Sequence, residues 1–169
     1  MKKILLALIF AFAFIGCSSR SDENTDKNVE AKLVVGKNLS GVKLKDQNEK
    51  PQTVTAETKV IFFSFSKPTG HACNDFLEKK PANFLAEHKA LYVADVSAAP
   101  SLIKKMFILP DLKELKFPIL LINDDTLSAA YSKGMNKEKI VVVLLKDGII
   151  TKIENLDDTQ ALEEFFAKL

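Results

Sequence analysis

Three short, continuous apolar runs constrain the fold of this chain more than any other feature of its sequence. They are Val60–Phe65, Leu91–Val96 and Pro118–Ile122. Such runs without polar alternation are typical of strands buried on both faces, inside a sheet that helices cover. Between the first two runs, apolar residues recur at helical spacing over residues 74–88, where Pro81 is expected to bend the helix. A second helical stripe follows Pro100 and consists of Leu102, Ile103, Met106 and Phe107.

Two further helices are predicted from their capping residues. A short helix over residues 126–133 is expected to begin after Asp125 and to end at Gly134. Asp157 or Asp158 is expected to cap the last helix. The apolar face of that helix consists of Leu162, Phe165, Phe166 and Leu169.

The remaining strands lie at the two ends of the domain. Short edge strands are expected at 32–35 and 42–54, with a turn at Asp46-Gln47-Asn48. Near the end, Ile140–Leu145 and Ile149–Ile153 flank Asp147-Gly148, a pair that favours a two-residue hairpin turn with positive φ at both positions. The sequence therefore predicts an α/β fold, a three-layer α/β/α sandwich around a mixed sheet.

The first residues of the chain have the pattern of an export signal. Lys2 and Lys3 precede the apolar run Ile4–Gly16, which is too short to span a bilayer. Phe14-Ile15-Gly16-Cys17 resembles a bacterial lipobox, with Phe14 in place of the usual Leu. The resemblance implies that residues 1–16 are a lipoprotein signal peptide and that Cys17 is the site of lipid attachment.

A polar segment follows the predicted anchor. Residues 17–30 contain almost no apolar side chains after Cys17 and are expected to form a flexible tether. Residues 31–169 contain no repeat and no second linker, so they are expected to form one domain. Ser18 lacks the acidic character associated with inner-membrane retention, which favours a periplasm-facing protein anchored in the outer rather than the inner membrane.

The charge of the chain excludes one class of partner. There are 24 Lys and Arg against 22 Asp and Glu, and removal of the signal peptide with Lys2 and Lys3 makes the mature chain formally neutral. A neutral chain lacks the basic excess that binds phosphate backbones, so no nucleic-acid partner is expected. Because Cys17 and Cys73 are the two cysteines, acylation of Cys17 leaves Cys73 without an intramolecular disulfide partner.

The order of the predicted elements resembles the thioredoxin-like fold, and within it the redoxins that include peroxiredoxins and periplasmic thiol-disulfide proteins. The closing part also resembles the periplasmic YtfJ family. The segments that carry the resemblance are Val35-Gly36-Lys37, residues 44–51, residues 117–124 and residues 142–148. In this fold the reactive thiol lies where the first central strand passes into the first long helix. The resemblance implies that Cys73 occupies this position and that the helix N-terminus lowers its pKa. The alternative is that Cys73 is an inert, buried side chain at the helix start, because free Cys is among the most buried residue types.

The residues around Cys73 depart from both redoxin patterns. Pro81 follows Cys73 at the distance found in thioredoxins, but Phe76 stands where a second Cys would be, so intramolecular dithiol exchange is not expected. The peroxiredoxin pattern has Thr where this chain has Gly70, and an Arg before the late strand where this chain has residues 137–139. That slot also lacks the cis-proline of thioredoxins. Lys137 or Lys139 would either support a thiolate or simply be solvated.

The sequence leaves two functions open. The first is an envelope lipoprotein whose degenerate redoxin domain is a binding or accessory module for another envelope protein or a small ligand. The second is a single-cysteine redox enzyme, with Cys73 as the catalytic nucleophile and an external thiol as resolver; Asp75 would oppose thiolate formation if the side chains are close. His71 and Cys73 are two metal-ligating side chains, which do not complete a site. No cofactor or metal is expected.

Overall fold

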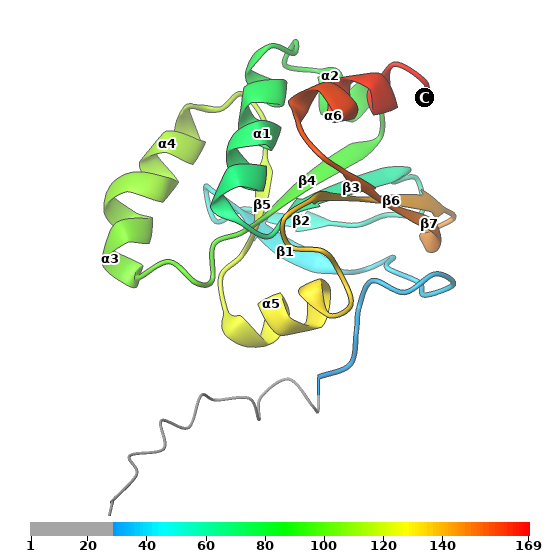
Figure 1. The fold of residues 1–169 in the computed structure, drawn as a ribbon, viewed down its shortest axis with the longest axis horizontal. Helices are drawn as coiled ribbons and strands as arrows, with labels where there is room; N and C mark the ends of the chain where they lie inside the picture. Colours follow the sequence, from blue (N-terminus) through cyan, green and yellow to red (C-terminus); the bar gives the residue numbers. More distant parts are fainter. Residues whose placement is uncertain (1–28) are drawn as a thin grey trace, which may run out of the picture.

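The computed structural model describes residues 29–169, which form a mixed seven-stranded sheet in the order β2-β1-β5-β4-β3-β6-β7 (Figure 1). The strands are β1 (Lys43–Asp46), β2 (Pro51–Thr53), β3 (Val60–Ser64), β4 (Ala90–Asp95), β5 (Ile119–Ile122), β6 (Ile140–Lys146) and β7 (Ile149–Leu156). The three predicted central runs are thus the strands β3, β4 and β5. Residues 32–35, which were predicted to be a strand, are not one.

The direction of the strands follows from their connections. The central strands β3, β4 and β5 are parallel, because helical segments connect them. Strands β1 and β6 flank this group and run antiparallel to β5 and β3. Strands β6 and β7 form the predicted hairpin, and the φ angles of 53° at Asp147 and 78° at Gly148 confirm the predicted turn.

Helices cover both faces of the sheet, which confirms the predicted three-layer sandwich. The helices are α1 (Lys67–Glu78), α2 (Phe84–Glu87), α3 (Ser101–Ile103), a π-helical turn (Lys104–Ile108), α4 (Leu109–Glu114), α5 (Asp125–Ser132) and α6 (Thr159–Phe166). Figure 1 shows α1, α2, α4 and α6 on one side of the sheet and α5 on the other. Within residues 29–169, no helix has the length and apolar character needed to cross a bilayer.

Alternation along β3 divides the core into two layers. Phe62 points to the side of α1 and α6, where it stacks on Tyr92 with ring centroids 4.9 Å apart. Phe63 points to the opposite side and stacks on Tyr131 of α5. Both phenylalanines are fully buried. A strand that packs helices on both faces has no polar alternation, which explains the continuous apolar run from Val60.

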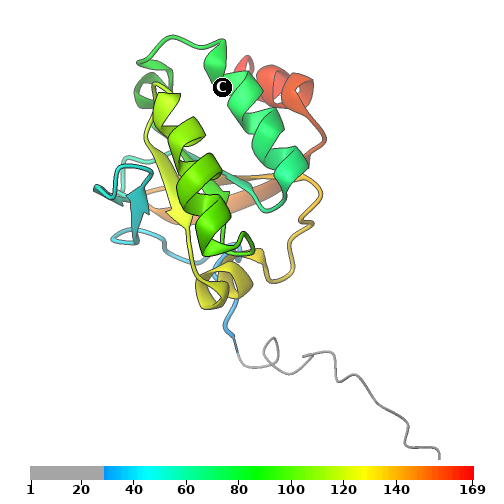
Figure 2. The same cartoon turned by 90° about the vertical axis from the view of Figure 1, so that its left-hand side faces the viewer.

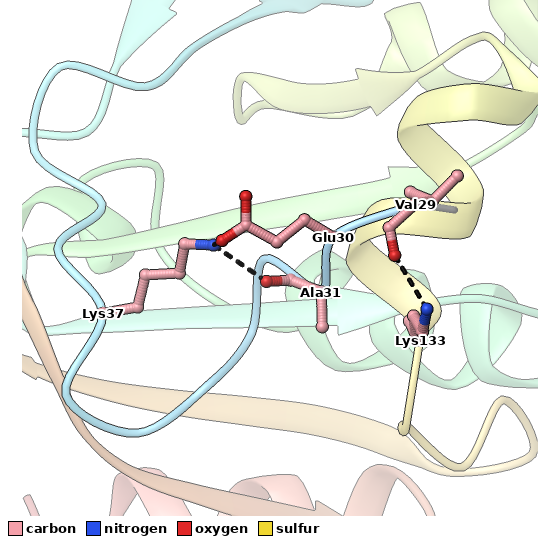
Figure 3. A network of polar contacts seen from close by, with 5 residues as sticks. All are labelled: Val29, Glu30, Ala31, Lys37 and Lys133. Carbon is pink, nitrogen blue, oxygen red and sulfur yellow. Dashed lines mark hydrogen bonds and ion pairs between the residues drawn. The ribbon is translucent and has the colours of Figure 1, made fainter. Parts of the chain in front are cut away.

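The chain enters the domain beside α5. The ammonium group of Lys37 donates to Glu30 Oε1 at 2.6 Å and to the carbonyl oxygen of Ala31 at 3.0 Å. Lys133, which follows α5, donates to the carbonyl oxygen of Val29 at 2.8 Å (Figure 3). These contacts hold the first described residues against the domain. The predicted signal peptide, Cys17 and the tether up to residue 28 lie outside the described residues.

Two predictions about helix boundaries need correction. The helix expected over residues 74–88 is instead the pair α1 and α2, and Pro81 lies in the loop between them rather than in a bent helix. The cap of α5 is Asp124 rather than Asp125, and it accepts a hydrogen bond from the Leu127 amide at 2.8 Å. Asp158, one of the two predicted caps of α6, accepts from the Ala161 amide.

Candidate functional site

The junction between β3 and α1 is the place where the resemblance put a reactive thiol. The structure places Ser66 there as the residue that caps α1, followed by Lys67, Pro68 and Thr69 in the first turn. Thr69 Oγ1 accepts from the Ser66 amide at 3.1 Å and donates to the Ser66 carbonyl oxygen at 2.9 Å. Pro68 lacks the amide hydrogen that would otherwise have no partner in a first turn. The junction therefore contains hydroxyl groups and no sulfur.

Cys73 does not lie at the start of the helix, so this part of the prediction was wrong. Helix α1 begins at Lys67, and Cys73 is nearly two turns further along it. Its side chain is fully buried, and it packs in the same core layer as Phe76 and Leu77. Unpaired amides and the positive helix end act only over the first turn. Neither effect is available to activate this thiol.

The surroundings of Cys73 favour its protonated form. Burial raises the pKa of the Cys73 thiol far above its ordinary value, and the hydrogen bond with Tyr92, which lowers it, is the smaller effect. The Tyr92 hydroxyl lies 2.8 Å from Ser64 Oγ, so the thiol ends a short buried chain of polar groups. Burial likewise raises the pKa of Tyr92 well above its ordinary value. These three side chains are neutral hydrogen-bonding partners at physiological pH.

The other residues considered from the sequence do not gather around Cys73. His71 is exposed whereas Cys73 is buried, because residues two apart on a helix point in different directions. Among residues 29–169, no three His, Cys, Asp or Glu side chains come together as a metal site. Lys139 forms an ion pair with Asp157. Phe76, in the place of a second cysteine, is a fully buried core residue.

A hollow lies next to this junction, between α1 and the helical segment 101–114. It has a volume of about 670 Å³, within the range of ligand sites. It begins at the carboxyl ends of β3 and β4, where Ser64 and Asp95 are the last strand residues. In α/β sheets, ligands bind preferentially outside the carboxyl ends of the strands. The hollow is therefore in the position where this fold class forms binding sites.

A second hollow continues the first along α1. It has a volume of about 480 Å³ and shares His71, Asn74 and Asp111 with the first. We call the two hollows together the α1 groove. Its lining includes both the first residue of α1, Lys67, and the last, Glu78. The groove thus follows the whole helix, a length of about 17 Å at 1.5 Å per residue. Figure 2 shows α1 and the segment 101–114 side by side.

Apolar side chains dominate the first hollow of the groove, next to the β3–α1 junction. Phe65, Val96, Ile108 and Leu112 form its inner wall. Ile103 and Phe107 line its rim and remain 41% and 56% exposed. Pro110 follows the π-helical turn and cannot donate the bond to residue 106 that an α-helix requires, which accounts for the irregular turn. The helical stripe predicted after Pro100 is therefore exposed to solvent beside the groove.

The second hollow of the groove, near the end of α1, is acidic. Asp75 and Glu78 project from α1, and Asp111 and Glu114 from α4. All four are exposed, and none forms an ion pair within the part of the chain that the structure describes. Between these walls, the Oδ1 atom of Asn74 is buried and has no hydrogen-bond partner among the described residues. An unpaired buried acceptor costs about 1–3 kcal/mol.

Sequence reasoning missed the residues that define this site. Ser66 and Pro68 are a typical helix cap and first-turn proline, and together they would have placed the helix start correctly. Gln47 lies in the predicted turn, but its side chain is buried: the side-chain amide donates to the carbonyls of Leu112 and Phe117 and accepts from the Ile119 amide. These bonds fix the end of α4 and therefore one wall of the groove. No local sequence signal indicates such long-range contacts.

Comparison with solved structures identifies the fold. A protein provisionally assigned as a thioredoxin from Neisseria meningitidis is 17% identical, with a TM-score of 0.52 over 78% of this chain and 89% of that one. A protein provisionally assigned as a disulfide isomerase from Bacteroides thetaiotaomicron is 16% identical, with a TM-score of 0.50 over 83% and 90%. No protein-family model and no curated protein matches the sequence. The chain therefore has a thioredoxin-like fold, as its sequence predicted.

Proposed function

We propose that this chain is a cell-envelope lipoprotein whose thioredoxin-like domain binds another envelope protein through the α1 groove and performs no thiol chemistry. The observation that carries the proposal is that the β3–α1 junction has hydroxyl groups and an adjoining groove in the place where the resemblance put a reactive thiol. Hydroxyl groups occupy the helix start, Cys73 is buried and protonated, and an open groove with an apolar wall lies alongside. A small ligand is the alternative occupant of the groove.

The single-cysteine enzyme has less support than the binding module. A nucleophilic thiol must be a thiolate and must meet its substrate, as reactive cysteines do in partly exposed, electropositive surroundings. Cys73 is fully buried among apolar side chains, and its pKa is raised rather than lowered. An external resolving thiol would also need access to Cys73. Both requirements conflict with its position in the core.

The binding function is tested by photocrosslinking in the intact envelope. p-Benzoylphenylalanine replaces Phe107 at the rim of the groove or, as the matched control, Lys152 on β7; both side chains are exposed. The proposal expects a defined crosslinked adduct from position 107 and none from position 152. Equal yields at the two positions, or no adduct at either, would contradict it.

The lipoprotein part of the proposal has its own test. The lipobox-like segment before Cys17 supports attachment of acyl chains to that residue, which would anchor the mature chain stably if more than one chain is added. Labelled palmitate is expected to enter the full-length protein and to be lost in Cys17→Ser. Incorporation that persists in this variant would place the lipid elsewhere and refute the anchor.

A further inference from the structure

The helical segment beside the α1 groove exposes an unusual amount of apolar surface. Four side chains on successive turns are between 41% and 65% exposed: Leu102, Ile103, Met106 and Phe107. Single exposed apolar residues are common, but a contiguous apolar surface marks an interaction site. Ile103 and Phe107 also line the groove, so this half of the exposed stripe adjoins the apolar inner wall. A ligand in the groove would cover these two side chains.

The shape of the groove favours a segment of polypeptide as its occupant. It follows α1 from its first residue to its last, about 17 Å, which corresponds to three turns of a second helix. Helices that bind in grooves of this kind place one apolar face against the groove wall, with anchors three and four residues apart.

The charge of the groove changes along its length. The end near the β3–α1 junction carries one positive and one negative side chain, Lys67 and Asp95. The far end carries two carboxylates on each wall, Asp75 and Glu78 on one and Asp111 and Glu114 on the other. Lys116 also lines the far end. The four carboxylates outnumber this ammonium group, so the far end carries a net negative charge. A cationic side chain between the two walls would meet carboxylates on both sides.

We infer that the occupant of the α1 groove is a basic amphipathic segment of the partner protein, with apolar side chains on the Ile103–Phe107 surface and Lys or Arg between the facing carboxylates. This inference rests on the proposed function and adds the chemical class of the partner. Electrostatic complementarity of this kind sets specificity and speeds association more than it raises affinity. Asn74, an α1 residue that lines both hollows, also has a buried Oδ1 atom with no hydrogen-bond donor among the described residues.

The inference is tested with a synthetic probe and the folded domain. The probe is a fluorescent fourteen-residue helical peptide with leucines on one face and lysines on the other, and its counterpart carries glutamate at every lysine position. Anisotropy titrations at low and high salt are expected to give binding at least tenfold tighter for the lysine peptide, with affinity that falls as salt rises. Equal binding of the two peptides, or no binding of either, would overturn the inference.

Matched variants assign the binding to the groove. D111N/E114Q is expected to weaken lysine-peptide binding about fivefold and to reduce its salt dependence, because two carboxylates are lost. D125N/E138Q removes the same charge from exposed positions away from the groove and should bind as wild type does. Phe107→Ser is expected to weaken binding about tenfold. Equal effects of the two charge variants, or wild-type binding by Phe107→Ser, would refute the assignment.

The binding function of the groove and the chemical class of the partner can be refuted separately. If position 107 crosslinks a partner in the envelope but the lysine peptide shows no preference, the partner class is wrong and the groove function stands. If position 107 gives no adduct, the groove function fails as well. Circular dichroism of each variant establishes that lost binding is not lost folding.

Discussion

The raised pKa of Cys73 makes a quantitative prediction about stability at alkaline pH. In the unfolded chain the thiol ionises with a pKa of about 8.5, whereas burial keeps it protonated in the folded domain. Above about pH 8.5 the unfolded state therefore binds fewer protons than the folded state, and stability falls by about 1.4 kcal/mol per pH unit for this group. Between pH 7 and pH 10 the loss amounts to about 2 kcal/mol.

The variant Cys73→Ala isolates this contribution. It loses packing around the missing sulfur at every pH, but it has no thiol to titrate. The stability advantage of wild type over Cys73→Ala should therefore shrink by about 2 kcal/mol between pH 7 and pH 10. Urea unfolding followed by circular dichroism, in the presence of a reductant, measures both proteins across this range. A difference that stays constant with pH would mean that Cys73 ionises normally in the folded state, and the buried-thiol argument would fail.

Three further predictions concern the scaffold. Gln47→Ala should cost about 3 kcal/mol of unfolding free energy, because three buried backbone groups lose their partner. The control Gln160→Ala, whose hydrogen bond is exposed, should cost under about 0.5 kcal/mol, and similar losses in the two variants would contradict the account. Tyr92→Phe should lower stability by about 1–3 kcal/mol by leaving Ser64 Oγ without its partner, and a neutral effect in urea unfolding would show that the hydroxyl pair is unimportant. Gly148→Ala should destabilise the domain by at least about 1 kcal/mol more than Gly41→Ala in thermal unfolding. Both glycines have positive φ, but only the new Cβ atom at position 148 would overlap Ser40. Equal losses of stability would exclude this overlap as a cause.

The fold could be predicted because its signals are local. The run from Val60 is apolar on both faces since helices pack on both, and the hairpin follows from the two residues Asp147 and Gly148. The start of α1 was misplaced because its first turns are polar, so the apolar spacing becomes visible only from Phe76. Treated as a small apolar residue, Cys73 would have extended that spacing back by a turn.

The groove could not be predicted from the sequence for a different reason. Helical spacing identifies the stripe that includes Ile103 and Phe107, but the spacing is the same whether a stripe faces the core or the solvent. The wall also depends on Gln47, which holds residues far along the chain. Contacts between distant segments leave no periodic pattern in either segment, so the site emerges only when the domain is folded.

The central claim is that the α1 groove, and not the thiol, is the functional part of this domain. It is tested most directly by crosslinking from position 107 in cells that carry Cys73→Ala, with protein levels matched to the parent. The account predicts the same adduct in the same yield as with Cys73 present, because a buried, protonated thiol takes no part in binding. Loss of the adduct in a variant that remains folded would contradict the account.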